Sequence, residues 1–163
     1  MLEALTTLGQ IVDNPHCADS LVLFYRDQLE YFRQNKSGAT TAEQQKPTVY
    51  YAVAFGASGD FTAPANSHIN EIIQYAGGRN IGENLSTWNI SREYLFAENP
   101  DLIFIRSEEL PHFVKTYPYN LLNAVKENRV YPIESGWIDV ISPRNFLAIE
   151  EIREKIQKLT INH

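Results

Sequence analysis

The sequence predicts an α/β protein in which helices cover both faces of a parallel sheet. From Pro47 to the C-terminus, strand-like apolar runs alternate with helical patterns, which is typical of parallel sheets. The run 102–105 (LIFI) is apolar throughout, as expected for a strand that is covered on both faces. Within 67–106, capping and breaking residues separate that strand from two short helices. These observations indicate a three-layer (αβα) fold.

Two predicted helices and a polar linker precede the α/β region. Residues 2–12 form a short amphipathic pattern that Asp13-Asn14-Pro15 ends, and a longer helical pattern runs over 16–34. The segment 35–46 is polar and small, which predicts a solvated loop. The apolar positions of the longer helix recur at three- and four-residue steps: Ala18, Leu21, Val22, Tyr25, Leu29 and Phe32. We therefore divide the chain into 1–46 (short helix, long helix and linker) and 47–163 (α/β lobe).

The first half of the lobe begins with a strand over 48–55, rich in β-branched and aromatic residues. A glycine-containing loop follows, and Ser67 is a predicted N-cap for the next helix. Gly77-Gly78 ends that helix, because glycine adopts the left-handed conformation without strain. The connection 79–90 has room for a short strand or turn. The helix has one apolar side, formed by Ile69, Ile72, Ile73 and Ala76.

The second half continues with a helix that Ser91 caps and Asn99-Pro100 ends, followed by the strand 102–105. We expect 108–118 to be irregular or briefly helical, 119–126 to be a helix that ends near Asn128, and 130–133 to be a strand. Ser142-Pro143 predicts the start of the last helix. The inward positions of that helix are Phe146, Ile149, Ile152, Ile156 and Leu159.

Composition limits the classes of function. The chain has 163 residues, a net charge of −6 and an isoelectric point near 5.2, which argues against a nucleic-acid-binding protein. No apolar run is long enough to cross a bilayer. The single cysteine, Cys17, excludes an internal disulfide, and the four histidines lack the spacing of a zinc site. The N-terminus has no basic region followed by an apolar core, so it does not read as a secretory signal.

An ordered set of motifs resembles one family of transport proteins. The motifs are AGGRN (76–80), SRE (91–93), NPDLIF (99–104), AVKENRVY (124–131) and SPR (142–144). This set is similar to the C-terminal lobe of the helical-backbone substrate-binding proteins that serve ABC importers for iron–siderophores, haem and vitamin B12. The resemblance covers nearly the whole chain. It implies a periplasmic-binding-protein-like lobe preceded by a long connecting helix, a non-enzymatic role and no resident cofactor or metal.

The resemblance also implies a partner structure. Members of this family have two lobes and work outside the inner membrane, so we expect a periplasmic or cell-surface full-length protein of which this chain is a truncated form. The expected partners are a metal-chelate or corrinoid ligand, an ABC permease, and the N-terminal lobe or a second copy of the chain. Glu93, in the SRE motif, resembles the glutamate that each lobe presents to an arginine of the permease. The residue alone favours an ordinary first-turn acid, and it is the resemblance that favours the docking role.

Ligands of open parallel sheets bind beyond the carboxyl ends of the strands, which points to a set of candidate ligand residues. Five of them follow strands: Phe55, Ser58, Phe61, Arg106 and Trp137. Trp88 lies in the connecting segment before the Ser91 helix. Arg144 lies in the predicted first turn of the last helix, where the helix dipole disfavours a cation, which suggests a carboxylate or phosphate partner. Several have a structural alternative: Phe55 as the last core residue of its strand, and Arg106 as a surface partner of Glu108 or Glu109. The two tryptophans lie in predicted loops, where a ligand, the other lobe or a second copy would cover them.

Other classes of function are weaker. Gly56-Ala57-Ser58-Gly59 is neither a nucleophile elbow nor a phosphate-binding loop, and Asp60 is the one obvious carboxylate at the strand ends. His112 with Tyr117 or Tyr119 has ligand types that haem iron accepts. The alternative to a transport role is a stand-alone interaction protein that dimerises through the half-cleft.

Overall fold

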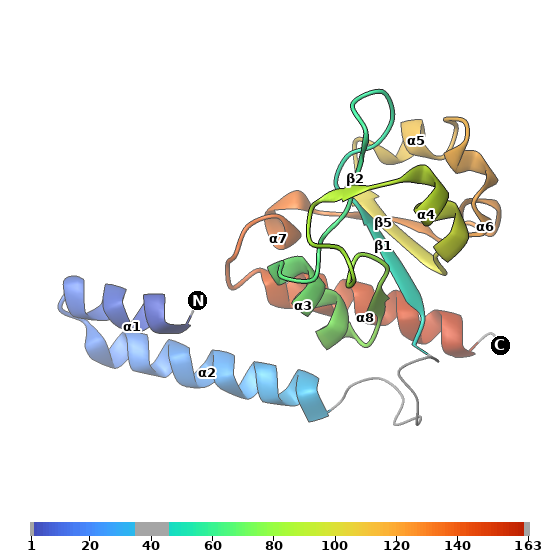
Figure 1. The fold of residues 1–163 in the computed structure, drawn as a ribbon. Coiled ribbons are helices and arrows are strands. Elements are labelled where there is room, and N and C mark those ends of the chain that lie inside the picture. The colour runs from blue at the N-terminus through green and yellow to red at the C-terminus, as the bar shows by residue number, and fades with distance from the viewer. Residues whose placement is uncertain (1, 35–45, 162–163) are drawn as a thin grey trace.

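The computed structural model describes residues 2–34 and 46–161 (Figure 1). Two helices, α1 (Leu2–Ile11) and α2 (Pro15–Gln34), precede the α/β lobe. The lobe then runs through β1 (Thr48–Ala52), β2 (Asp60–Phe61), α3 (His68–Ala76), β3 (Arg79–Asn80), β4 (Asn89–Ile90), α4 (Arg92–Glu98) and β5 (Leu102–Arg106). It ends with α5 (Leu110–Phe113), the 3₁₀ turn η2 (Tyr119–Leu121), α6 (Asn123–Lys126), β6 (Val130–Ile133), α7 (Ser135–Ile138) and α8 (Asn145–Ile161).

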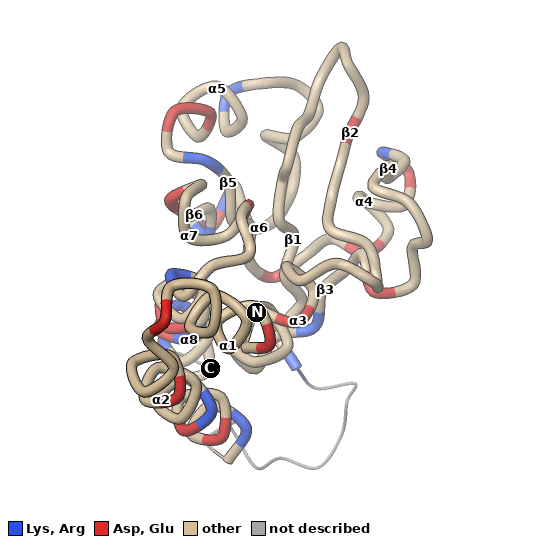
Figure 2. The backbone as a smooth tube through the Cα atoms, turned by 90° about the vertical axis from the view of Figure 1, so that its left-hand side faces the viewer, with Lys and Arg blue, Asp and Glu red and all other residues tan. Residues whose placement is uncertain are grey.

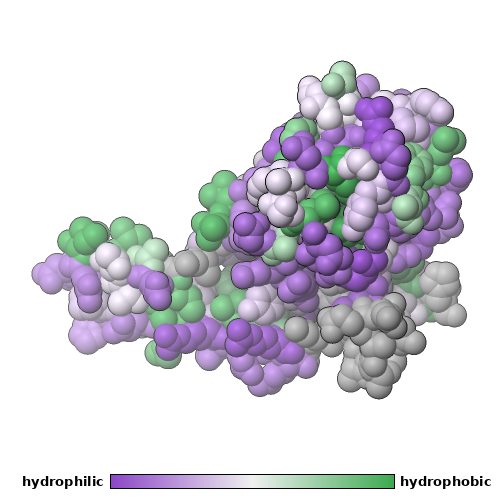
Figure 3. Space-filling view, viewed as in Figure 1, coloured by the Kyte–Doolittle hydropathy of each residue, from purple (hydrophilic) through white to green (hydrophobic). Residues whose placement is uncertain are grey.

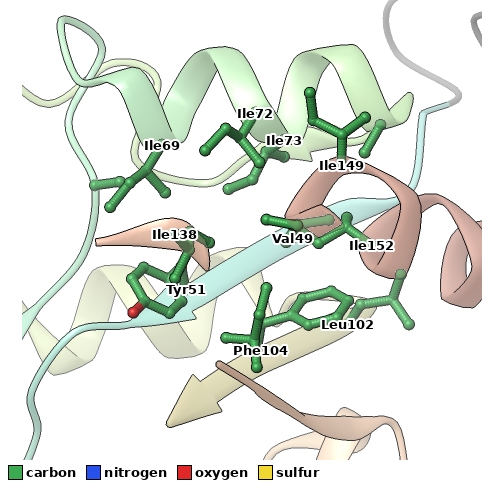
Figure 4. Packing of buried hydrophobic residues seen from close by; sticks show 14 of the residues in the cluster. Val49, Tyr51, Ile69, Ile72, Ile73, Leu102, Phe104, Ile138, Ile149 and Ile152 are labelled. Carbon is green, nitrogen blue, oxygen red and sulfur yellow. The ribbon is translucent and has the colours of Figure 1, made fainter. Parts of the chain in front are cut away.

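The described strands of the lobe form a parallel sheet in the order β3-β1-β5-β6, and β2 pairs with β4 in a separate antiparallel ribbon. Alternate residues of β1 point to opposite faces, as the pleat requires. Val49 and Tyr51 pack against isoleucines of α3 and α8 (Figure 4). Tyr50 and Ala52 pack on the other face, with residues of α4, α5 and α6. The predicted three-layer α/β fold is confirmed.

The AGGRN motif joins α3 to the sheet at close range. Gly77 ends α3 with φ +96°, and its N–H donates to the Gln74 carbonyl. A Cβ on Gly78 would lie 2.8 Å from Cγ2 of Val49, so the motif lets the chain pass directly against β1. Asn80 is fully buried, and its amide donates to the Ala63 carbonyl at 2.9 Å.

The NPDLIF motif joins β5 to β1. Asn99 ends α4 in the left-handed conformation, and the next two residues turn the chain into β5. Asp101 Oδ2 then accepts from both the backbone N–H and the hydroxyl of Thr48, each at 2.7 Å. The motif therefore sets the register at the start of the two central strands.

The edge strands of the sheet are short or interrupted. β3 has two residues, and β6 contains Pro132, which is paired in register with Ile105 of β5. The Arg129 carbonyl accepts from the Ile103 N–H, so Tyr131 points its backbone polar groups toward β5 and Pro132 points away from it.

Helices α1 and α2 form an antiparallel hairpin that projects beyond the lobe (Figure 1). Gly9 allows close packing, because a Cβ there would lie 2.3 Å from Cβ of Ala18. The C-terminal half of α2 contacts the lobe through aromatic stacking, with 5.4 Å between the ring centroids of Tyr25 and Phe146 and 5.9 Å between those of Phe32 and Phe146. Acidic and basic residues are interspersed along α2 and α8 (Figure 2). Within residues 2–34 and 46–161, no helix is both long and apolar enough to cross a membrane.

Most predicted elements are present, with four corrections. The first strand ends at Ala52 rather than at 55. The helix predicted over 119–126 is two pieces, η2 and α6, because Leu122 between them is extended. The last helix begins at Asn145, and Ser142-Pro143 forms the turn before it, in which the Ser142 N–H donates to Asn145 Oδ1. Trp137 lies in α7, not in a loop. The predicted loop over 35–46 lies outside the described residues except for Lys46.

Candidate ligand face and docking helix

An aromatic cluster lies just beyond the carboxyl ends of the central strands. Phe55 follows β1, and its ring centroid lies 4.9 Å from that of Phe113, 5.4 Å from that of Tyr119 and 5.6 Å from that of His112. Phe113 and Tyr119 are fully buried, whereas Phe55 is half-buried and His112 is exposed. Phe55 therefore joins the core on one side and is open to solvent on the other, and its contact with a ligand stays a prediction.

Asp60 is the centre of a buried polar network beside this cluster. The sequence identified it as the one carboxylate at the strand ends, and the structure shows its side chain only 3% exposed. Asp60 Oδ1 accepts from the Tyr119 hydroxyl and from the Gly56 N–H at 3.2 Å. Asp60 Oδ2 accepts from Nε of Arg92 at 3.0 Å. Because the carboxylate has charged and polar donors, its burial is compensated.

The same network raises the pKa of the neighbouring phenol. Burial is the main cause of the raised pKa of Tyr119, and the hydrogen bond to Asp60 adds to it. The Tyr119 oxygen also accepts from the Gly56 N–H at 3.0 Å. Tyr119 therefore remains a neutral donor to Asp60 throughout the physiological pH range.

Arg106 is held by an acid that the sequence argument did not select. Its Nε and Nη2 both donate to Asp139 Oδ2, at 3.1 and 3.0 Å. The other oxygen of Asp139 accepts from the Tyr51 hydroxyl at 2.5 Å. The expected alternative pairing with Glu108 or Glu109 is wrong. Arg106 thus ties the end of β5 to the residue that follows α7, while its side chain keeps 36% of its surface exposed.

The remaining candidate ligand residues divide between two regions. Ser58 is exposed and Phe61 is half-buried in the ribbon, where it pairs with Asn89 next to the exposed Trp88. Trp137 packs against the core below the sheet rather than standing free. Arg144 is exposed and precedes the first turn of α8, so the prediction that it stands in that first turn is wrong.

Arg144 also lines a separate hollow. That pocket, of about 330 Å³, is formed by Phe24, Tyr25, Gln28, Pro143, Arg144, Phe146, Leu147 and Glu150. A second pocket, of about 310 Å³, lies between α2, α3 and α8, and none of the candidate ligand residues lines it. The structure therefore groups Phe55, Ser58 and Phe61 near the strand ends and separates Arg144 from them.

Glu93 lies at the start of α4 and is exposed. Ser91 caps the helix, since its Oγ accepts from the Tyr94 N–H at 3.1 Å. Arg92, between the cap and Glu93, turns back to the 56–60 loop, and its Nη2 donates to the Gly56 carbonyl at 2.8 Å. The SRE motif is thus joined directly to the loop that carries Ser58.

Sequence reasoning missed Arg92, Tyr119 and Asp139 as organisers of this face. Their partners are 32, 59 and 33 residues away in the chain, so spacing gave no signal. Arg92 had one available signal, its place between a cap and an exposed acid in a family motif. Among the described residues there is no group of three or more His, Cys, Asp or Glu side chains suited to a metal ion.

Comparison with known families decides the class of this chain. A family model described as periplasmic binding protein matches residues 1–135. This chain belongs to the periplasmic binding protein family. The family is one of solute-binding proteins, in agreement with the motif resemblance.

The relatives of this periplasmic binding protein include a vitamin B12-binding protein and an ABC transporter substrate-binding protein. It is 23% identical over 150 residues to a vitamin B12-binding protein of Vibrio vulnificus, covering 90% of this chain and 52% of the relative. Among solved structures, an ABC transporter substrate-binding protein from Listeria monocytogenes matches with a TM-score of 0.75 and 22% identity, over 95% of this chain and 62% of the other.

A haem-binding relative has the same fold. The periplasmic haem-binding protein RhuT from Roseiflexus matches with a TM-score of 0.77 and 17% identity, over 96% of this chain and 62% of that one. At these identities the structural matches establish the fold. The chain spans about half the length of the curated relatives it matches.

Proposed function

We propose that this chain is the C-terminal lobe and connecting helix of an ABC-importer substrate-binding protein. The ligand is an iron–siderophore, a haem or a corrinoid, held between this lobe and an N-terminal lobe outside the inner membrane. The observation that supports the proposal is the contact of Arg92 with Gly56, because it joins the SRE motif, which we propose docks to the permease, to the loop that we propose faces the ligand.

The ligand contacts we propose are Phe55, Ser58, Phe61 and Trp88, with Arg106 presenting the exposed part of its guanidinium. Aromatic rings suit the flat face of a tetrapyrrole, and a cation suits its carboxylates or an anionic chelate. We propose that the two remaining candidates, Trp137 and Arg144, contact the other lobe rather than a ligand at the strand ends. In this family-level function the protein carries out no reaction.

Half a cleft binds weakly, because ligand affinity depends on burial from both sides. We expect haemin and cyanocobalamin to change the fluorescence of Trp88 or Trp137 in this 163-residue chain only at concentrations far above the micromolar range. A saturable response to micromolar haemin or cyanocobalamin contradicts the proposal that a second lobe completes the site.

Docking through Glu93 is tested by Glu93→Gln in cells that depend on the importer. We expect uptake to fall about threefold to tenfold, because exposed charges at a docking surface act mainly on the rate and orientation of encounter. Glu154→Gln, an exposed glutamate on α8, is the matched control and leaves uptake unchanged. Equal uptake by the Glu93 and Glu154 variants argues against docking at the SRE motif.

A second candidate function, a stand-alone interaction protein, is favoured by the surface of the α1–α2 hairpin. Apolar side chains gather at that end of the molecule (Figure 3). The exposed ones on the hairpin are Leu8, Ile11, Val12, Leu21, Leu23, Phe24 and Tyr31. A second copy covering this surface would form the dimer through the hairpin rather than through the strand ends.

Sedimentation and native mass separate the two functions. A concentration-dependent dimer of this chain that Phe24→Glu converts to monomer supports the interaction protein. A native protein recovered from its own cells with a mass well above 18.6 kDa, sufficient for two lobes, supports the importer component. In the importer the other lobe covers the hairpin.

A further inference from the structure

We propose that Arg92, Asp60 and Tyr119 couple the first turn of α4 to the loop that carries Phe55 and Ser58. The inference rests on the proposed function, since that function places docking at Glu93 and ligand at this loop. Arg92 and Tyr119 are positioning residues in this scheme, and neither is required to touch the ligand.

The first link is Arg92, which holds both ends of the 56–60 loop. Its Nη2 donates to the Gly56 carbonyl at 2.8 Å and its Nε donates to Asp60 Oδ2 at 3.0 Å. The two acceptors are four residues apart, so one planar guanidinium fixes the span of the loop. A shift of the α4 start therefore displaces Gly56 and Asp60 together.

The second link is Tyr119, which joins the loop to the aromatic cluster. Its hydroxyl donates to Asp60 Oδ1 and accepts from the Gly56 N–H at 3.0 Å. Its ring lies 5.4 Å from Phe55 and 5.0 Å from Phe113, centroid to centroid. A displacement of Asp60 is therefore passed through Tyr119 to the ring of Phe55, which forms the solvent-facing side of the aromatic cluster.

We expect the 56–60 loop to be displaced as one unit. Gly56 and Gly59 have φ of +96° and +101°, a region that favours glycine, and no other atom lies within 4 Å of the position a Gly56 Cβ would take. The open space beside Gly56 leaves room for a displacement of the loop. The buried carboxylate resists separation from its donors, because an unpaired buried charge is costly. The network therefore transmits a displacement rather than absorbing it.

Amide hydrogen exchange on the 163-residue chain tests the coupling without ligand or permease. Ser91→Ala removes the N-cap bond and loosens the first turn of α4 without touching the network. We expect it to accelerate exchange of the Gly56 amide about fivefold, along with that of Tyr94. Exchange of Tyr50 in β1 reports on the loss of global stability that removal of the cap causes, so the coupling is measured as the acceleration at Gly56 beyond that at Tyr50.

A double-mutant cycle assigns the coupling to Arg92. We expect Arg92→Met to accelerate Gly56 exchange about tenfold, and Ser91→Ala to add nothing at Gly56 in that background. Arg92→Lys restores part of the protection, because an ammonium pairs with Asp60 but does not also span to the Gly56 carbonyl. Arg79→Met is the matched control: it breaks the 2.7 Å ion pair with Glu98 at the other end of α4 and leaves Gly56 exchange within about twofold.

Two results overturn the coupling. In the first, Ser91→Ala accelerates Tyr94 but not Gly56. In the second, Ser91→Ala accelerates Gly56 equally with and without Arg92. Failure of the proposed function gives a different result. Glu93→Gln then leaves uptake unchanged, while Ser91→Ala and Arg92→Met still act non-additively on exchange of the Gly56 amide.

Discussion

Charged residues at the strand ends of this lobe are held mainly by one another. Arg106 is bound to Asp139, and Arg92 is bound to Asp60, so both of these guanidinium groups have an acidic partner within the lobe. Such pairs orient the guanidinium and leave part of it free for a second partner. At the residue scale, these ion pairs therefore hold the side chains of the candidate ligand face in fixed orientations.

Gly78 gives the sharpest prediction for a single residue. We expect Gly78→Ala to lower the free energy of unfolding by about 1–3 kcal/mol, because the new methyl group meets Val49 at 2.8 Å and Ile156 at 3.1 Å in a packed core. Urea unfolding measures the effect. Gly136→Ala is the control, since its nearest neighbour is the flexible end of Arg144 at 3.9 Å. Similar losses for the two variants would refute the overpacking argument.

At the scale of elements, the α1–α2 hairpin meets the lobe through a buried arginine. Arg153 of α8 is 8% exposed, and its Nη2 donates to the Phe32 carbonyl at 3.2 Å and the Tyr75 carbonyl at 3.1 Å. Its guanidinium lies over the Phe32 ring, 4.7 Å from the centroid. Burial lowers the pKa of this side chain. One cation thus joins the last turns of α2 and α3 to α8.

Removal of that cation tests whether α2 moves with the lobe. We expect Arg153→Met to lower the free energy of unfolding by about 1–3 kcal/mol and to accelerate amide exchange in the last turn of α2, because two carbonyls lose their donor. Arg33→Met changes an exposed arginine whose contact with the Tyr75 hydroxyl is 3.5 Å, and we expect it to stay within about 0.5 kcal/mol. Unchanged exchange in α2 after Arg153→Met would show that aromatic stacking alone holds the helix.

Element boundaries also show what the sequence could predict. The caps Ser67 and Ser91 and the stops at Gly77 and Asn99 were correct, because each is a local hydrogen bond or backbone conformation. The apolar run of β5 was correct because burial on both faces leaves no alternation. The pairings Asp60–Arg92 and Arg106–Asp139 were not predictable, since they depend on which strands become neighbours. The predicted ligand residues remain predictions.

At the scale of the whole molecule, buried tyrosines make stability fall at alkaline pH. Burial is the main cause of the raised pKa values of Tyr50 and Tyr51, and Asp60 and Asp139 add to it respectively. Above about pH 10 the unfolded chain loses phenolic protons that the folded protein keeps. The unfolded state then binds fewer protons, so each such tyrosine lowers the free energy of unfolding by about 1.4 kcal/mol per pH unit.

Tyr50→Phe isolates this effect. Among the described residues no atom accepts from or donates to the buried Tyr50 hydroxyl, so we expect its removal to be neutral or slightly stabilising near pH 8. Above pH 10 the variant should lose stability less steeply than the parent protein, as measured by urea unfolding at several pH values. If the free energies of unfolding of the two proteins fall equally steeply with pH, Tyr50 does not cause the loss of stability at alkaline pH.

Pro132 also affects how copies of this protein meet in crowded solution. It supplies no N–H on the outer edge of β6, and the opposite edge of the described sheet is the two-residue β3. Neither edge offers a full row of donors and acceptors to a passing β-strand. Fibril-like growth by edge-to-edge stacking of strands is thereby hindered.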